Sequence, residues 1–218
     1  MNSKMMLACV ASLLGLAGAA NADVWIENGD ASGSGQIVLG SGPLTAITGV
    51  LTGNSTELAD FEDLFVFSIT EPLNFRATTV GGSGFDTQLF LFDAAGNGIA
   101  FNDDSAGTFN STLTSTFTSS LAAGTYTIAV SGYDRDALDD GGLEIFADSP
   151  FNGERGPTAG RGPIASWGGS GSTGSYTISF NGAGFVPTPG AAALAGLGFL
   201  AAAKRRRRQD QRLLIDQA

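Results

Sequence analysis

The sequence predicts an all-β protein built as an antiparallel β-sandwich, with a cleaved signal helix before it and a short apolar helix after it. Large apolar or aromatic side chains recur at every second position in residues 65–69, 126–131 and 176–180. That period is typical of strands with one buried face. Between residues 23 and 185 no stretch shows sustained helical periodicity. The pattern therefore favours strands throughout this region.

Further strand-like runs are bounded by Gly, Asn, Asp or Pro, as expected for short strands joined by turns. These runs are Gln36 to Leu39, Leu44 to Leu51, Asn74 to Val80, Gln88 to Phe92, Ile99 to Asn102 and Ser111 to Phe117. Residues 87–102 predict a hairpin, because the Asn97-Gly98 pair tolerates the positive φ angles of a tight turn. Residues 57–62 could form one helical turn.

Residues 134–173 are rich in Gly, Asp and Pro and are expected to form a long loop. A loop of this length is usually functional or disordered. It could contain a strand at Leu143 to Phe146.

The N-terminus has the three parts of a secretory signal peptide. Lys4 precedes an apolar run from Met5 to Ala20, and Ala20-Asn21-Ala22 is a small-x-small cleavage site. We expect residues 1–22 to be removed after Ala22. The single cysteine, Cys9, lies in the removed part, so the mature chain uses neither disulfides nor thiolate chemistry.

The C-terminus predicts a second targeting element in residues 186–208. Val186-Pro187-Thr188-Pro189 is followed by an apolar segment from Ala191 to Ala203 and a basic block that ends in Arg205, Arg206, Arg207 and Arg208. At about 1.5 Å per residue the apolar helix is shorter than a bilayer core. Basic residues next to such a segment keep its C-terminal end in the cytoplasm. A plain tail anchor or a buried core helix is the alternative.

This three-part layout resembles the bacterial PEP-CTERM sorting signal. The resemblance implies cleavage by the membrane protease exosortase, after transient anchoring in the membrane. Thr188 stands where that family usually has Glu, and residues 209–218 extend beyond the arginine block as a cytoplasmic tail.

Residues 23–185 are the length of one domain and are strongly acidic. They hold 19 Asp and Glu against four Arg, a formal charge of −15. Such a surface repels nucleic acid and anionic lipid. It suits either solubility or the binding of divalent cations.

Four sequence pieces in residues 45–135 resemble the bacterial pre-peptidase C-terminal domain. They begin at Asp60, Phe85, Asn102 and Ala123, and run as DFEDLFVF, FDTQLFLFD, NDD and AGTYTI. The resemblance implies a compact jelly-roll-like sandwich that assists secretion or binds matrix polymers. Some collagenase-linked relatives bind calcium.

Acidic residues gather at expected strand ends, where hard oxygen ligands could hold calcium. The candidate ligands are Asp60, Glu62, Asp63, Asp103 and Asp104. The alternative is that these aspartates cap turns and solubilise strand ends. A further acidic group, Asp134, Asp136, Asp139 and Asp140, is more readily explained as a solvated loop.

The chain has no histidine, which excludes Ser-His and Cys-His nucleophiles and histidine-bound zinc. Paired carboxylates of the glycosidase kind remain formally possible. We expect no enzymatic activity.

Two functions fit these observations. The first is an exported structural protein of the bacterial surface or extracellular matrix, associated with exopolysaccharide. Its partners would be the secretion translocon, signal peptidase and an exosortase-like protease. The second is a surface binding module, an adhesin or carbohydrate reader, in which Trp167, Tyr133 or Phe151 contacts the ligand.

Overall fold

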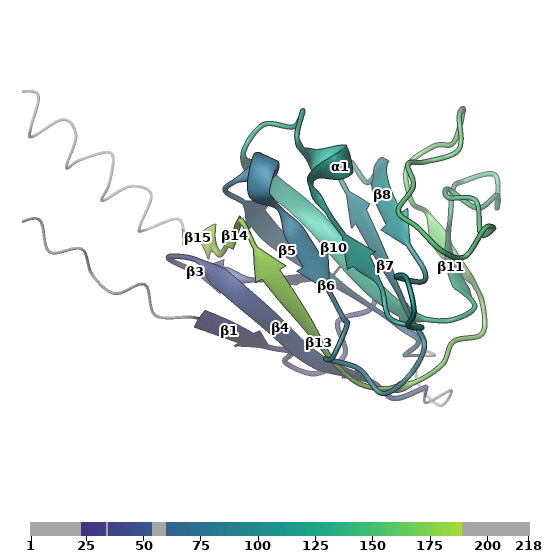
Figure 1. Cartoon of the computed structure of the whole chain (residues 1–218), viewed down its shortest axis with the longest axis horizontal. Helices are drawn as coiled ribbons and strands as arrows, with labels where there is room; N and C mark the ends of the chain where they lie inside the picture. The colour runs from purple at the N-terminus through teal and green to yellow at the C-terminus, as the bar shows by residue number, and fades with distance from the viewer. Residues whose placement is uncertain (1–22, 34, 54–59, 189–218) are drawn as a thin grey trace, which may run out of the picture.

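Two β-sheets packed face to face make up most of the molecule, seen in a computed structural model of the chain (Figure 1). The structure describes residues 23–33, 35–53 and 60–188. In spatial order the first sheet contains β1 (Asp23–Ile26), β4 (Leu44–Leu51), β13 (Gly174–Asn181), β6 (Arg76–Thr78) and β9 (Thr112–Leu113). The second sheet contains β14 (Ala183–Gly184), β5 (Glu62–Ile69), β10 (Gly124–Gly132), β7 (Thr87–Phe92) and β8 (Gly98–Asn102), with β2 (Gln36–Ile37) beside β5. The predicted β-sandwich is confirmed, but its sheets are mixed and not purely antiparallel, because β1 pairs with β4 and β2 with β5 in parallel.

The core between the sheets follows from the period-two pattern. In β5, Phe65, Phe67 and Ile69 are fully buried. The Phe67 ring lies 5.4 Å from the ring of Phe180, which belongs to β13 of the opposite sheet. Alternate apolar positions of the two sheets thus close one continuous core.

The outer face of the second sheet is buried as well. Residues 134–173, expected to be a loop, contain two antiparallel strands, β11 (Arg135–Leu138) and β12 (Ser166–Gly169). Figure 1 shows β11 beyond β7 and β8, on the outside of the sandwich. The segment packs Ala137, Ile145 and Phe146 against the second sheet, and we call residues 134–173 the cover. No strand forms at 143–146, where Glu144 makes a single bridge to Leu138.

Three of the weaker strand predictions differ from the structure. Residues 36–39 are split between β2 and β3 (Leu39–Gly40), because each pairs with a different strand. Residues 74–80 start in a 3-10 turn, η1 (Pro72–Asn74), and only three of them form β6. Residues 111–117 contain the short β9 and then a helical turn, α1 (Ser115–Thr118), which begins where the Thr114 hydroxyl accepts the amide hydrogen of Thr116. Such an N-cap diverts a Thr-rich run from strand to helix.

The hairpin predicted at 87–102 is confirmed, since β7 and β8 pair antiparallel. Its turn is built differently from the expectation. Gly96 takes the positive φ, 85°, and no non-glycine residue that the structure describes does so. The Asp93 carboxylate accepts hydrogen bonds from the amides of Ala95 at 2.8 Å and Asn97 at 2.9 Å, and from Asn97 Nδ2 at 2.8 Å.

Both ends of the folded body lie close to the expected processing segments. β1 starts at Asp23, the first residue after the expected signal peptide. At the other end β15 (Val186–Pro187) pairs with β3, so the domain continues two residues past its expected end at 185. The signal peptide, with Ala20 and Ala22, and residues 189–218, with Pro189 and the arginine block, lie outside the described residues, as does most of the expected turn at 57–62. Within the described ranges no helix is long and apolar enough to cross a membrane.

Replacing Phe67 with Ala should lower the free energy of unfolding by about 3–5 kcal/mol, because the cavity lies between both sheets. Denaturant unfolding checks this. Phe109→Ala, at a side chain that is 69% exposed, is the control and should change stability by less than about 0.5 kcal/mol. Equal losses in the two variants would contradict the assigned core.

Replacing Asp93 with Ala should cost about 1 kcal/mol at pH 7. Partial burial opposes ionisation of Asp93, but the hydrogen bonds from Asn97, Ala95 and Gly96 hold its pKa below the usual range. A lowered pKa contributes stability above the unfolded-state pKa, and this contribution is lost as pH falls through the folded-state pKa. The difference between parent and variant should therefore shrink below about pH 4. A difference that stays constant down to pH 2 would assign the effect to packing.

Candidate functional site

Acidic side chains converge at three places in the described part of the chain. The entry cluster is Asp30, Asp60 and Asp63; the rim cluster is Asp86, Asp103 and Asp104; the loop cluster is Asp134, Asp136 and Asp148. In each, one carboxylate oxygen per residue lies within 4.8 Å of the others. Two oxygens that each lie about 2.4 Å from one calcium ion can be no more than about 5 Å apart. The spacing of each trio therefore suits a single cation.

The entry cluster lies where the chain enters β5. The Asp63 carboxylate is fully buried and accepts the Tyr176 hydroxyl at 2.6 Å and the Ala31 amide at 3.1 Å. Burial, together with the nearby charges of Glu27 and Asp60, raises the pKa of Asp63 to about 8 despite the hydrogen bond from Tyr176. These carboxylates repel one another strongly in the absence of a counter-charge.

Only one of the two carboxylate oxygens of Asp60 accepts hydrogen bonds among the described residues. Its Oδ2 accepts the Thr52 amide at 2.8 Å and the Thr52 hydroxyl at 2.6 Å. Its Oδ1 is buried and accepts no hydrogen bond within the described ranges. An oxygen in this state is available to a cation.

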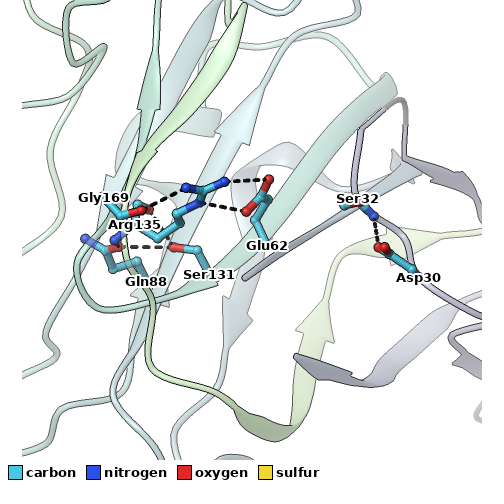
Figure 2. Close-up of polar contacts among 7 residues, drawn as sticks. All are labelled: Asp30, Ser32, Glu62, Gln88, Ser131, Arg135 and Gly169. Atoms are coloured by element: carbon cyan, nitrogen blue, oxygen red, sulfur yellow. Dashed lines mark hydrogen bonds and ion pairs between the residues drawn. The ribbon is translucent and has the colours of Figure 1, made fainter. Parts of the chain in front are cut away.

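Glu62, which the sequence grouped with Asp60 and Asp63, has another partner. Successive residues of a strand point to opposite faces, so Glu62 and Asp63 diverge. Figure 2 shows Glu62 facing the Arg135 guanidinium, with Nε to Oε2 at 2.8 Å and Nη2 to Oε1 at 3.3 Å. Arg135 also donates to the Gly169 carbonyl at 2.8 Å. Glu62 therefore ties the cover to the second sheet and is not one of the residues that converge with Asp60 and Asp63.

Asp103 and Asp104 meet Asp86 and not the Asp60 group. Asp86 and Asp30 were not among the predicted ligands, because nothing in their local sequence marks them. The predicted hairpin of 87–102 could have identified Asp86, since antiparallel pairing brings the start of one strand beside the end of the next.

The second acidic group noted in the sequence is divided. Asp134 and Asp136 enter the loop cluster together with Asp148. Asp139 instead closes a local turn, where its Oδ1 accepts the amides of Gly141 and Leu143, both at 3.0 Å. Asp140 is exposed. Asp139 is thus buried in a turn that it caps, and the solvated loop expected for this group is wrong for Asp139.

The three aromatic residues expected to contact a ligand differ in their exposure. Trp167 is partly buried and packs edge-on against Phe90, with ring centroids 5.1 Å apart. Tyr133 is 38% exposed and Phe151 is 41% exposed. Their rings meet edge to face at 6.0 Å. Of these three side chains, Tyr133 and Phe151 are therefore the exposed ones, and they form a pair.

Residues 61–132 match the family model of the bacterial pre-peptidase C-terminal domain. The match supports the resemblance of the body to that domain and, with it, an exported bacterial protein. It covers the chain from the start of β5 to the end of β10 and includes β7 and β8. β4 and β13, which complete the first sheet, lie outside the match, as does the cover. No curated protein matches the chain.

Replacing Trp167 with Ala should lower the free energy of unfolding by about 2–4 kcal/mol, because its ring supports the cover. Chemical denaturation measures this loss. Tyr133→Ala is the matched control at an exposed aromatic and should cost less than about 1 kcal/mol. If the Trp167 variant is as stable as the parent, the ring does not support the cover, and Trp167 is again a candidate for contacting a ligand.

Proposed function

We propose that this chain is an exported, non-enzymatic protein of the bacterial cell surface or extracellular matrix, retained in an exopolysaccharide layer. The observation that carries the proposal is the position of the folded body. Its strand pairing starts at Asp23, directly after the expected signal-peptide cleavage, and ends at Val186 and Pro187, the first two residues of the Val-Pro-Thr-Pro segment. Among the described residues, cuts after Ala22 and at or after Thr188 leave every strand pair intact.

This arrangement would require two membrane proteases, one for each end of the chain. Signal peptidase would act after passage through the secretion translocon. An exosortase-like protease would act at or after Thr188, where the chain leaves β15. The apolar segment and the arginine block would hold the protein in the membrane until that cut.

Charge is consistent with a role in a hydrated matrix. Residues 23–185 carry a formal charge of −15, so the protein stays soluble and repels nucleic acid. Contact with anionic polysaccharide would then need bridging cations, which the acidic clusters are suited to bind.

The intact mass of protein recovered from the native cell surface and from the medium tests this proposal. We expect a mature chain that begins at Asp23 and ends close to Pro187. Deleting residues 204–208 should prevent the second cut by removing the basic stop, while export continues. Recovery of residues 190–218 in the surface protein would show a lasting anchor and contradict the proposed sorting.

A second candidate function is a surface binding module, an adhesin or carbohydrate reader, that depends on calcium. The Tyr133–Phe151 pair favours it, because exposed aromatic rings stack on sugar faces. The pair also lies beside acidic groups: desolvation, then the charges of Asp134 and Asp148, raise the pKa of Tyr133. A glycan array probed with and without calcium tests it. Tyr133→Ala should abolish binding, whereas Phe109→Ala should leave binding unchanged. No saturable binding would exclude this role.

A further inference from the structure

We propose that Asp86, Asp103 and Asp104 bind a divalent cation, with calcium the best fit. This site is separate from the entry cluster and holds whether or not the chain is processed at its C-terminus. It lies at the edge of the second sheet where β7 begins and β8 and β10 end.

The strand register brings these residues together. β7 and β8 are antiparallel, with Leu89 opposite Asn102. Asp86, just before β7, therefore lies at the same edge as Asp103 and Asp104, just after β8. β10 ends at this edge too, since Gly132 is opposite Thr87 and the Tyr133 amide donates to the Asp86 carbonyl at 3.1 Å.

Hydrogen bonds fix the backbone at this edge. Asn102 Nδ2 donates to the Asp104 carbonyl at 2.8 Å, and the Thr112 amide donates to Asn102 Oδ1 at 2.6 Å. The Asp104 amide donates to the Phe151 carbonyl at 3.1 Å. The three carboxylates are thus presented by a preorganised frame, which lowers the entropic cost of binding.

The independent observation that points to a ligand is the Asp103 side chain. It exposes only 1% of its surface, and its Oδ1 is buried without a hydrogen-bond partner in the described part of the chain. Asp86 Oδ1 and Asp104 Oδ1 are in the same condition. A buried carboxylate without a donor is costly, and burial at this level normally comes with a partner or a metal. Three such oxygens, on residues whose carboxylates converge within 4.8 Å, are explained by a cation between them.

Neighbouring carboxylates add to the negative charge at this site and so favour the binding of a cation. Burial, then the charges of Asp104, Asp86, Asp148 and Asp136, raise the pKa of Asp103 to about 7. The loop cluster therefore lies close enough to add to the negative field. Of its members, Asp136 accepts a hydrogen bond, from Gln88 Nε2 at 3.2 Å.

Calcium fits this set better than magnesium or zinc. The candidate ligands are three carboxylate oxygens. Calcium accepts oxygen ligands in flexible geometry, whereas magnesium demands near-octahedral geometry. Zinc sites favour His and Cys. An extracellular module of this kind is expected to bind calcium with a dissociation constant of about 10⁻⁴–10⁻³ M.

The test is calcium titration by isothermal calorimetry, paired with thermal unfolding in EDTA and in calcium, on the chain from Asp23 onward at pH 8. Asp103→Asn keeps the shape and removes the charge. Asp30→Asn disables the exposed member of the entry cluster, so that the two sites are counted separately. Asp140→Asn makes the same charge change at an exposed position away from the site.

We expect Asp103→Asn to weaken one class of calcium site at least about tenfold, whereas Asp30→Asn and Asp140→Asn leave that class intact. The order of the unfolding temperatures of the parent and the Asp103 variant should reverse between EDTA and calcium. In EDTA the Asp103 variant should be at least as stable as the parent, because repulsion is relieved. In calcium it should be less stable, because binding to the native state is lost.

Loss of stability in EDTA and calcium alike would make Asp103 a structural residue and overturn the proposal. So would calcium binding that Asp103→Asn leaves unchanged. If the Asp103 variant does not fold, Asp86→Asn, at a less buried member of the trio, replaces it with the same expected reversal.

Discussion

Burial of the second sheet on both faces is the constraint from which the rest of the structure follows. In β7 every residue is buried. Leu89 and Leu91 face the core between the sheets, while Phe90 and Phe92 belong to the outer aromatic group with Phe146. A two-layer sandwich would leave that outer group in water, at a cost of about 25 cal/mol per Å² of apolar surface. The cover is therefore an integral layer of the fold.

The cover also determines where the charges lie. It starts directly after β10, and Arg135 fixes it by its ion pair with Glu62 and by its amide, which donates to Gln88 Oε1 at 3.1 Å. The same anchoring brings Asp136 near enough to the rim cluster for its charge to act on Asp103. Apolar packing thus forces carboxylates together at one edge, and the electrostatic repulsion between them is the cost of that packing. A cation bound at the proposed site would offset this cost and so help to hold the cover in place.

The sequence predicted most of the sandwich, because period two survives in any strand with one solvated face. It predicted less where pairing or capping decided the outcome, as at α1, where the Thr114 hydroxyl terminates a strand-like run. The run QLFLF in β7 carried a signal that was not used, since a continuous apolar strand indicates burial on both faces. It could have predicted that residues 134–173 form a packed layer and that Trp167 belongs to it.

The acidic clusters were harder to predict for a different reason. Asp60 and Asp63 are joined by Asp30, 30 positions or more away in the sequence, and strand alternation separates Glu62 from its neighbour Asp63. The strand register brings each cluster together, and only the proximity of Asp86 to Asp103 follows from a hairpin that the sequence could predict.

Calcium affinities of extracellular modules, about 10⁻⁴–10⁻³ M, are far weaker than those of cytosolic sensors. A cation at the proposed site would therefore make full stability of the fold depend on calcium in that range, and the described residues contain no cysteine with which a disulfide could supply that stability instead.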